Sequence, residues 1–201
     1  LTIKNNLFEC GWGINCDSKY QEDIYIYNNT FIGNPSYTTY WPVAIDLIGV
    51  NNYDVRNNIT IDYKGNGAHR YISGGSGTCD YNTAWNSDGS IPSGTPNVQP
   101  HENWGINPRF VNFVAGGGGD YHLQSNSPCI DTGVTLSVVT DDFDGNPRPY
   151  GAWYDIGAYE YVGLNPPLGL SISASPTSGD APLTVNFSAN ATGGTRPYTY
   201  S

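Results

Sequence analysis

The chain has 201 residues, and its 18 Asp and Glu outnumber eight Lys and Arg, which gives a formal net charge of −10 at pH 7. This excess of carboxylates disfavours nucleic acid and bare polyanions such as pectin or alginate as partners, unless cations bridge them. The charged fraction of only 13% agrees with an extracellular protein, and no apolar run is long enough to span a membrane.

A repeated motif opens the chain. Three octapeptides superimpose without gaps: LTIKNNLF (1–8), IYIYNNTF (24–31) and YDVRNNIT (53–60). A fainter copy, GTCDYNTAW (77–85), keeps only the second asparagine. The aligned asparagines are Asn6, Asn29, Asn58 and Asn82. Recurrence at roughly 20–30 residues is typical of stacked units that bury their apolar faces against one another.

Each copy reads as a short strand that ends at a corner. Apolar residues alternate before the asparagines, as Ile24 and Ile26 do, so one face is expected to be buried and the other wet. No helical periodicity separates the copies, so parallel strands linked by turns should coil into a solenoid with rungs roughly 4.8 Å apart. An asparagine at each corner can hydrogen-bond to its equivalents and tolerates left-handed backbone. The aligned asparagines should therefore form a structural ladder.

Residues 1–85 resemble the rungs of a right-handed parallel β-helix of the pectate-lyase-like superfamily. Four later blocks resemble the C-terminal end of secreted β-helix proteins of the choice-of-anchor Q type: INPRFVN (106–112), GDYHLQSNSPCIDTG (119–133), DDFDGNPRP (141–149) and YDIGAYEY (154–161). This resemblance implies a final coil and a cap over residues 86–161 that close the end of the solenoid.

A change of composition follows the cap. Residues 162–169, VGLNPPLG, are rich in proline and glycine and should form an extended linker. Residues 170–201 alternate as short strands separated by turn residues, as in a sandwich. They resemble the start of a PKD (polycystic kidney disease-type) domain, through SPTSGDAPLTVNFSA and GGTRPYTYS. The expected fold class is all-β, a right-handed parallel β-helix with a cap and then a truncated immunoglobulin-like sandwich. We expect a piece of a longer, secreted or cell-surface protein.

The four cysteines divide by context. Cys79 aligns with the inward-facing Ile26 and is expected to be a buried thiol. Cys129 looks buried in the choice-of-anchor Q resemblance. Cys10 and Cys16 lie close together in the turn-rich stretch CGWGINC and are the candidate disulfide pair.

The acidic turn TDDFDGNPR is the candidate metal site. Asp142, Asp144 and Asn146 alternate as oxygen ligands do in a calcium loop, and Gly145 permits a tight turn. The turn lacks the later glutamate of such a loop. In the resembled family this segment belongs to the cap, where its aspartates would satisfy backbone amides. No cofactor is expected, and calcium at this turn is the alternative.

One column of the wet face offers groups for chemistry: Lys4, Tyr27, Arg56 and Asp80. A polysaccharide lyase needs a base and a cation near a uronate, and this column holds both kinds of group. A solvated face of mixed charge explains the same residues, and we favour it because a fold alone does not establish an activity. No catalytic site is expected within these residues, and whether the longer protein is an enzyme stays open.

Aromatic residues crowd the second repeat and its loop. Together with two cations they are the candidate glycan contacts: Tyr25, Tyr27, Tyr40, Trp41, Lys4 and Arg56. Tyr40 and Trp41 could instead cover a loop, or the surface could contact another subunit. The predicted function is a structural or adhesive extracellular module that contacts polysaccharide or another extracellular protein, or that forms part of a surface fibre or layer. The alternative is the non-catalytic C-terminal end of a carbohydrate-active enzyme, a polysaccharide lyase or glycoside hydrolase, whose active site lies upstream.

Overall fold

The computed structural model describes residues 1–9, 13–16, 23–36, 43–47, 50–63, 69–70, 76–92, 100–163 and 169–192. Throughout these residues the chain is all-β, with strands and turns and no helix. No helix that could cross a membrane occurs in this described part. The chain divides into two compact units, Leu1–Tyr161 and Val162–Ser201. The core of the expected linker, 164–168, and residues 193–201 lie outside the described residues.

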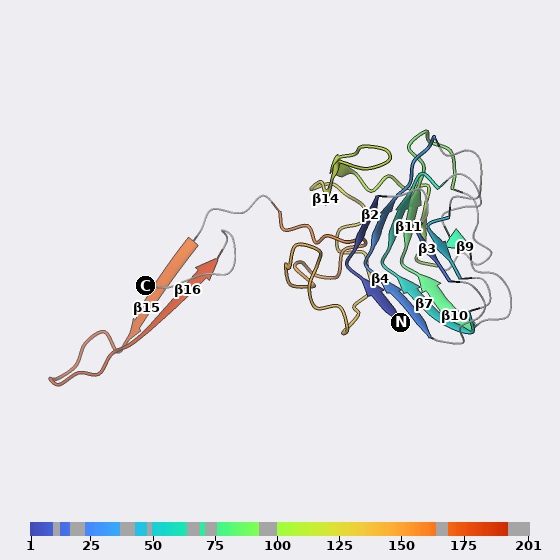
Figure 1. Ribbon diagram of the computed structural model, residues 1–201. Helices are drawn as coiled ribbons and strands as arrows, with labels where there is room; N and C mark the ends of the chain where they lie inside the picture. Colours follow the sequence, from blue (N-terminus) through green and yellow to red (C-terminus); the bar gives the residue numbers. More distant parts are fainter. Residues whose placement is uncertain are drawn as a thin grey trace. The chain divides into compact units, whose positions relative to one another are not determined.

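Three parallel sheets build the first unit. The first contains β1 (Thr2–Lys4), β4 (Ile24–Tyr27), β7 (Asn52–Arg56) and β10 (Ser76–Asp80), which lie side by side in Figure 1. The second contains β2 (Leu7–Glu9), β5 (Thr30–Ile32), β8 (Ile59–Ile61), β11 (Thr83–Trp85) and β12 (Asn103–Trp104). The third contains β3 (Ile14–Asn15), β6 (Ile45–Asp46) and β9 (His69–Arg70). The chain visits the sheets in turn and returns to the first one strand further along.

The strands pair in the register that the alignment of the repeats predicts. Ile3 pairs with Ile26, Ile26 with Val55, and Val55 with Cys79. The neighbouring position pairs Lys4 with Tyr27, Tyr27 with Arg56, and Arg56 with Asp80. Because side chains alternate between the two faces of a strand, a one-residue slip would turn the apolar set outward. Burial of that set therefore fixes the register.

Apolar side chains from the sheets fill the interior. Ile26, Val55, Phe31 and Ile59 are all fully buried. The rings of Phe8 and Phe31 stack with centroids 4.7 Å apart, one strand above the other. Burial of each such side chain contributes about 1.5–3 kcal/mol. These contacts hold successive turns together.

After the last parallel strand, the chain forms a small antiparallel pair, β13 (Phe110–Asn112) and β14 (Asp120–Leu123), and then a long irregular segment. This region has a core cluster in common with the second sheet: Ile32, Ile59, Ile61, Phe110, Tyr121, Leu123, Cys129, Ile156, Ala158 and Tyr159. Residues as far apart in sequence as Ile32 and Tyr159 therefore belong to one apolar core.

The second unit is a hairpin of β15 (Gly169–Ser175) and β16 (Asn186–Thr192). The antiparallel register pairs Ile172 with Ala189 and Ala174 with Phe187, whereas Ser173 pairs with Ser188. Directly opposite residues share a face, so one face of the hairpin is apolar and the other polar. Ile172 and Phe187 on the apolar face are 67% and 75% exposed.

Candidate functional site

The corner between the first and second sheets carries a ladder of asparagine side chains. Asn29, Asn58 and Asn82 are fully buried. The Nδ2 of Asn6 donates to the Oδ1 of Asn29 at 2.9 Å, Asn29 donates in the same way to Asn58 at 3.0 Å, and Asn58 to Asn82 at 2.9 Å. Each Oδ1 also accepts the backbone N–H of the asparagine before it. The structure thus brings together all four asparagines of the expected ladder.

A second column of corner residues has a different task. Asn5, Asn28 and Asn57 have left-handed backbone, with φ of 55°, 52° and 59°, and Tyr81 takes their place in the fourth turn with φ of 59°. Asparagine visits this region at lower cost than bulkier residues. We expected a single asparagine per corner to provide both the left-handed turn and the ladder, whereas the structure divides these roles between neighbours.

Side chains of this second column hold the C-terminal part of the unit, 131–157. They donate to backbone carbonyls there: Asn5 to Asp141 at 2.5 Å, Asn28 to Asp155 at 3.0 Å and Asn57 to Val134 at 2.8 Å. Asn57 Oδ1 in return accepts the Val134 N–H at 2.9 Å. The corner therefore fastens a segment that lies 77 to 136 residues away in sequence.

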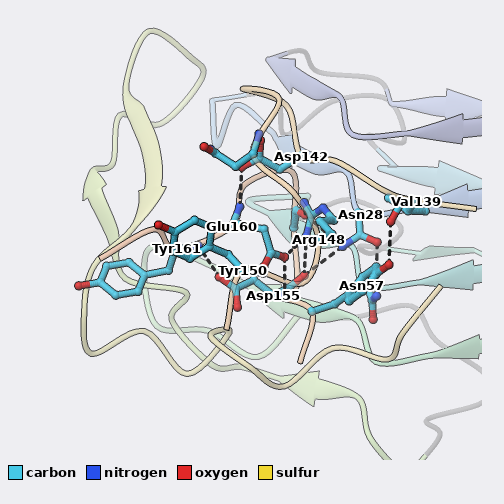
Figure 2. A network of polar contacts seen from close by, with 12 residues as sticks. Asn28, Asn57, Val139, Asp142, Arg148, Tyr150, Asp155, Glu160 and Tyr161 are labelled. Atoms are coloured by element: carbon cyan, nitrogen blue, oxygen red, sulfur yellow. Dashed lines mark hydrogen bonds and ion pairs between the residues drawn. The ribbon is translucent and has the colours of Figure 1, made fainter. Parts of the chain in front are cut away.

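A buried ion pair fixes this segment from within. The side chains of Arg148 and Glu160 are both fully buried, and Arg148 Nη1 donates to Glu160 Oε1 at 2.5 Å. Figure 2 shows this pair together with Asp155 and the corner residues Asn28 and Asn57. Burial lowers the pKa of Arg148. Burial and the charge of Glu160 raise the pKa of Asp155 to about 7.

The acidic turn belongs to the same network. Asp142 Oδ1 accepts the backbone N–H groups of Asp144 and Asn146 at 2.9 and 2.8 Å, and its Oδ2 accepts that of Glu160 at 2.9 Å. Asp144 Oδ2 contacts His122 Nε2 at 2.7 Å. No group of three or more His, Cys, Asp or Glu suited to a metal ion occurs among the described residues. Asp142 thus has the turn-capping role that was the alternative to calcium, and calcium binding here stays a prediction.

Tyr27 differs from the expectation of a wet face. Its side chain is only 5% exposed and packs against Leu136 and Val139. Its hydroxyl donates to Asp54 Oδ2 at 2.8 Å, and burial and this carboxylate raise its pKa. The assignment of Tyr27 as a glycan contact is therefore not compatible with the structure, because the C-terminal segment covers the ring.

The two cations of the expected column are engaged within the chain. Lys4 Nζ donates to the Val138 carbonyl at 2.7 Å. Arg56 forms an ion pair with Asp54, and its Nε donates to Asp54 Oδ1 at 2.5 Å. Each cation thus has a local partner, which limits what either could offer a bound sugar.

Other predicted residues are placed in part. Tyr25 is 36% exposed and its hydroxyl contacts Asp23 at 3.3 Å. Tyr40 and Trp41 lie outside the described residues.

The predicted thiols are also placed in part. Cys79 and Cys129 are buried cysteines, as expected, and burial raises the pKa of Cys129 to about 12. Cys16 is a free, half-buried thiol. Cys10 lies outside the described residues. Because Cys16 is a free thiol, the structure does not contain the expected Cys10–Cys16 disulfide.

Sequence reasoning missed Glu102, which ends the ladder. Asn82 Nδ2 donates to Glu102 Oε1 at 2.8 Å, and the Cys79 thiol lies 3.5 Å from the same oxygen. Glu102 Oε2 is buried, with no hydrogen-bond partner in the described part of the chain. Burial raises the pKa of Glu102 to about 7. The signal that could have found it is its spacing, since it follows Asn82 by 20 residues.

An aromatic stack lies at the last corner. The rings of Tyr81 and His101 are 4.3 Å apart and within 8° of parallel. His101 is itself held by Asp80, whose Oδ2 lies 2.8 Å from His101 Nδ1 and whose Oδ1 accepts the His101 N–H at 3.0 Å. Tyr81 is therefore fixed on one side by a ring that is anchored in turn.

A pocket of about 340 Å³ opens beside this stack. Its lining residues are Tyr81, Asp131, Thr132, Gly133, Val134, Thr135 and Trp153. The indole of Trp153 is 58% exposed, and its backbone N–H donates to Asp131 Oδ1 at 2.8 Å. Two aromatic side chains thus border a carboxylate. The only sequence signal for this pocket is Tyr81, which replaces the asparagine of the other corners.

No protein-family model, curated protein or solved structure matches this chain. The case for a function therefore depends on the side chains described above.

Proposed function

We propose that residues 1–161 form a right-handed parallel β-helix with a C-terminal cap, and that the protein is a secreted or cell-surface structural module that adheres to polysaccharide. The asparagine ladder and the repeated parallel register support the stacked arrangement. Parallel strands joined within one sheet cross over with a right hand in nearly all proteins, which supports the handedness. The apolar and polar faces of the C-terminal hairpin support a PKD-like sandwich that begins at residue 170.

The observation that carries polysaccharide binding is the pocket between Tyr81 and Trp153. Aromatic rings stack on the C–H faces of sugars, and carboxylates accept hydrogen bonds from sugar hydroxyls. Small-molecule sites are concave, with apolar walls and a few placed polar groups, and this pocket has that composition. An exposed indole in such a pocket favours a binding role over mere packing.

The engagement of Lys4 and Arg56 favours adhesion over lyase chemistry. A lyase needs a cation that is free to stabilise an enolate at the substrate. Here Lys4 binds a carbonyl and Arg56 is held by Asp54 in a bidentate pair. Both cations support the structure of the sheet surface instead.

Binding of the protein to a panel of insoluble and soluble polysaccharides, neutral and acidic, tests the proposal. We expect retention in pull-down and affinity electrophoresis without the release of new reducing ends or unsaturated products. Failure of the correctly folded protein to bind any member of the panel would remove the adhesive function. The remaining role would then be contact with another protein subunit, and analytical ultracentrifugation would detect such contact between copies of this chain.

A further inference from the structure

Resting on the proposed function, we infer that the Tyr81–Trp153 pocket is a subsite for one pyranose ring that carries no carboxylate. Trp153 stacks on the ring face, Tyr81 forms the opposite wall, and Asp131 accepts hydrogen bonds from ring hydroxyls. Its volume of about 340 Å³ lies at the small end of ligand pockets, which fits a single sugar unit of a longer chain.

The repeat explains why the pocket opens at this turn. In three turns the corner asparagine donates to the segment 131–157 or to its neighbours and fastens it to the sheet. In the fourth turn Tyr81 has no side-chain amide to donate, and a cavity lies beside it. The pocket lies beside Tyr81, the corner residue that is not an asparagine. This coincidence favours a binding role over packing alone.

Tyr81 is also unusual in its backbone. A bulky residue at φ of 59° is a rare conformation that persists only where the surroundings enforce it, and such residues concentrate at binding sites. Stacking on His101, which Asp80 holds through two hydrogen bonds, orients the Tyr81 ring. The wall is therefore positioned before any ligand arrives.

Hydrogen bonds hold the Asp131 carboxylate and the Trp153 backbone of the opposite wall. Asp131 Oδ1 accepts the Trp153 N–H at 2.8 Å, and the Asp131 N–H donates to the buried Asp155 Oδ1 at 2.8 Å. A side chain at Gly151 would collide with Asp131 Oδ1, so glycine there keeps the carboxylate in place. Pre-organised walls reduce the entropy lost on binding. The indole remains 58% exposed and ready to stack.

The charge of the pocket sets its selectivity. Among the described residues that line the pocket, Asp131 is the one charged side chain, and none is a lysine or arginine. The whole chain carries −10. A uronate carboxylate in the pocket would lie well within the screening length of about 10 Å from Asp131 at 0.1 M salt, and repulsion would oppose binding. A hydroxyl-bearing ring without a carboxylate meets an acceptor instead.

Isothermal titration of the full chain tests this subsite, with cello-, xylo- and manno-oligosaccharides as neutral probes and oligogalacturonate as the uronate probe. We expect at least one neutral series to bind and oligogalacturonate to bind at least tenfold more weakly. Trp153→Ala and Tyr81→Asn should each weaken the neutral ligand at least tenfold. Tyr81→Asn restores the residue that the other three corners use, so it removes the ring while it keeps the turn. Phe143→Ala, which removes an aromatic that is 50% exposed outside the pocket, is the matched control and should bind as the parent does.

Asp131→Asn keeps an oxygen for the Trp153 N–H and removes the charge, so it should reduce the discrimination against oligogalacturonate. Thermal unfolding of each variant checks that it is folded. If a pocket variant does not fold, Thr135→Ala at the exposed rim of the pocket is used in its place. Undiminished binding in the pocket variants, loss of binding on Tyr25→Ala, or preference for oligogalacturonate would overturn the subsite while leaving adhesion intact. Absence of all binding by the parent would overturn adhesion and the subsite together.

Discussion

Glu102 accepts a hydrogen bond from Asn82 at 2.8 Å and so takes the place that a further asparagine would have in the ladder. Between the earlier turns, the amide oxygen of the next asparagine accepts this hydrogen bond. At the end of the ladder, a carboxylate oxygen accepts it. An amide of the same shape would accept the same bond without a charge. The free-energy cost of burying this carboxylate depends on whether it is ionised. The stability that Glu102 contributes therefore depends on pH.

Glu102→Gln should stabilise the protein at pH 8 more than at pH 5. The pKa of Glu102 rises from 4.5 to about 7 on folding, so the folded state binds more protons than the unfolded state between these values. Stability from this group is therefore complete below pH 4.5, declines as pH rises and reaches its lowest level above pH 7, a total change of about 3 kcal/mol. Urea unfolding at several pH values measures it, and an equal effect of Glu102→Gln at pH 5 and pH 8 would contradict the prediction.

Asn58→Ala should destabilise the first unit by about 3–5 kcal/mol, because it removes the buried bonds of the Asn58 side chain to Asn29 and Asn82 and leaves the Asn29 backbone N–H without its acceptor. The matched control is Asn52→Ala at the start of β7, since Asn52 is exposed and, among the described residues, its side chain bonds to the Asp23 carboxylate at 2.9 Å. We expect that control to change the free energy of unfolding by less than about 0.5 kcal/mol. Denaturant titration of both variants distinguishes a ladder from general asparagine content. Similar losses of unfolding free energy in the two variants would contradict a specific role of the ladder.

Arg148→Met should destabilise the fold by about 3–5 kcal/mol at pH 8, because it leaves Glu160 buried without its cation and removes the positive charge that interacts with Asp155. The loss should be smaller at pH 5. The pKa of Asp155 rises from 3.8 to about 7 on folding, so this carboxylate is neutral in the folded protein at pH 5 and charged at pH 8. Unfolding monitored by near-ultraviolet circular dichroism at both pH values measures the difference. A larger loss at pH 5 would exclude this electrostatic explanation.

The part of the fold that could be predicted from sequence is the part that repeats. Ile26, Val55 and Cys79 share a slot because their octapeptides align, and the second asparagine of each pair is aligned by the same argument. The burial of Tyr27 had no such signal, since the residues that cover it, Leu136 and Val139, lie over a hundred positions away in an irregular segment. Short-range periodicity describes a strand and its faces. Short-range periodicity does not predict which face of a strand a distant segment will cover.

The candidate site follows the same division. Tyr81 was visible as an exception to the asparagine pair, but its partners in the pocket, Asp131 and Trp153, come from that later segment. The first asparagine of each pair was assigned no contact of its own. Its outward amide bonds to backbone carbonyls, as Asn28 does to Asp155, and carbonyls are present at every residue. A sequence cannot mark which carbonyl will be used.

The strain at Tyr81 gives a prediction that is independent of any ligand. Tyr81→Asn and Tyr81→Ala both remove the ring and its stack on His101, so their difference reports on the backbone and on any bond that the new amide forms. Asparagine tolerates the left-handed turn at φ of 59° better than alanine, as it does at Asn57, and the asparagine variant should be more stable by about 1 kcal/mol. Asn57→Ala and Asn57→Gly extend the comparison, because glycine keeps the turn while both lose the bonds to Val134. Equal stability within either pair of variants, measured by urea unfolding, would mean that the corner backbone relaxes and that Tyr81 carries no strain.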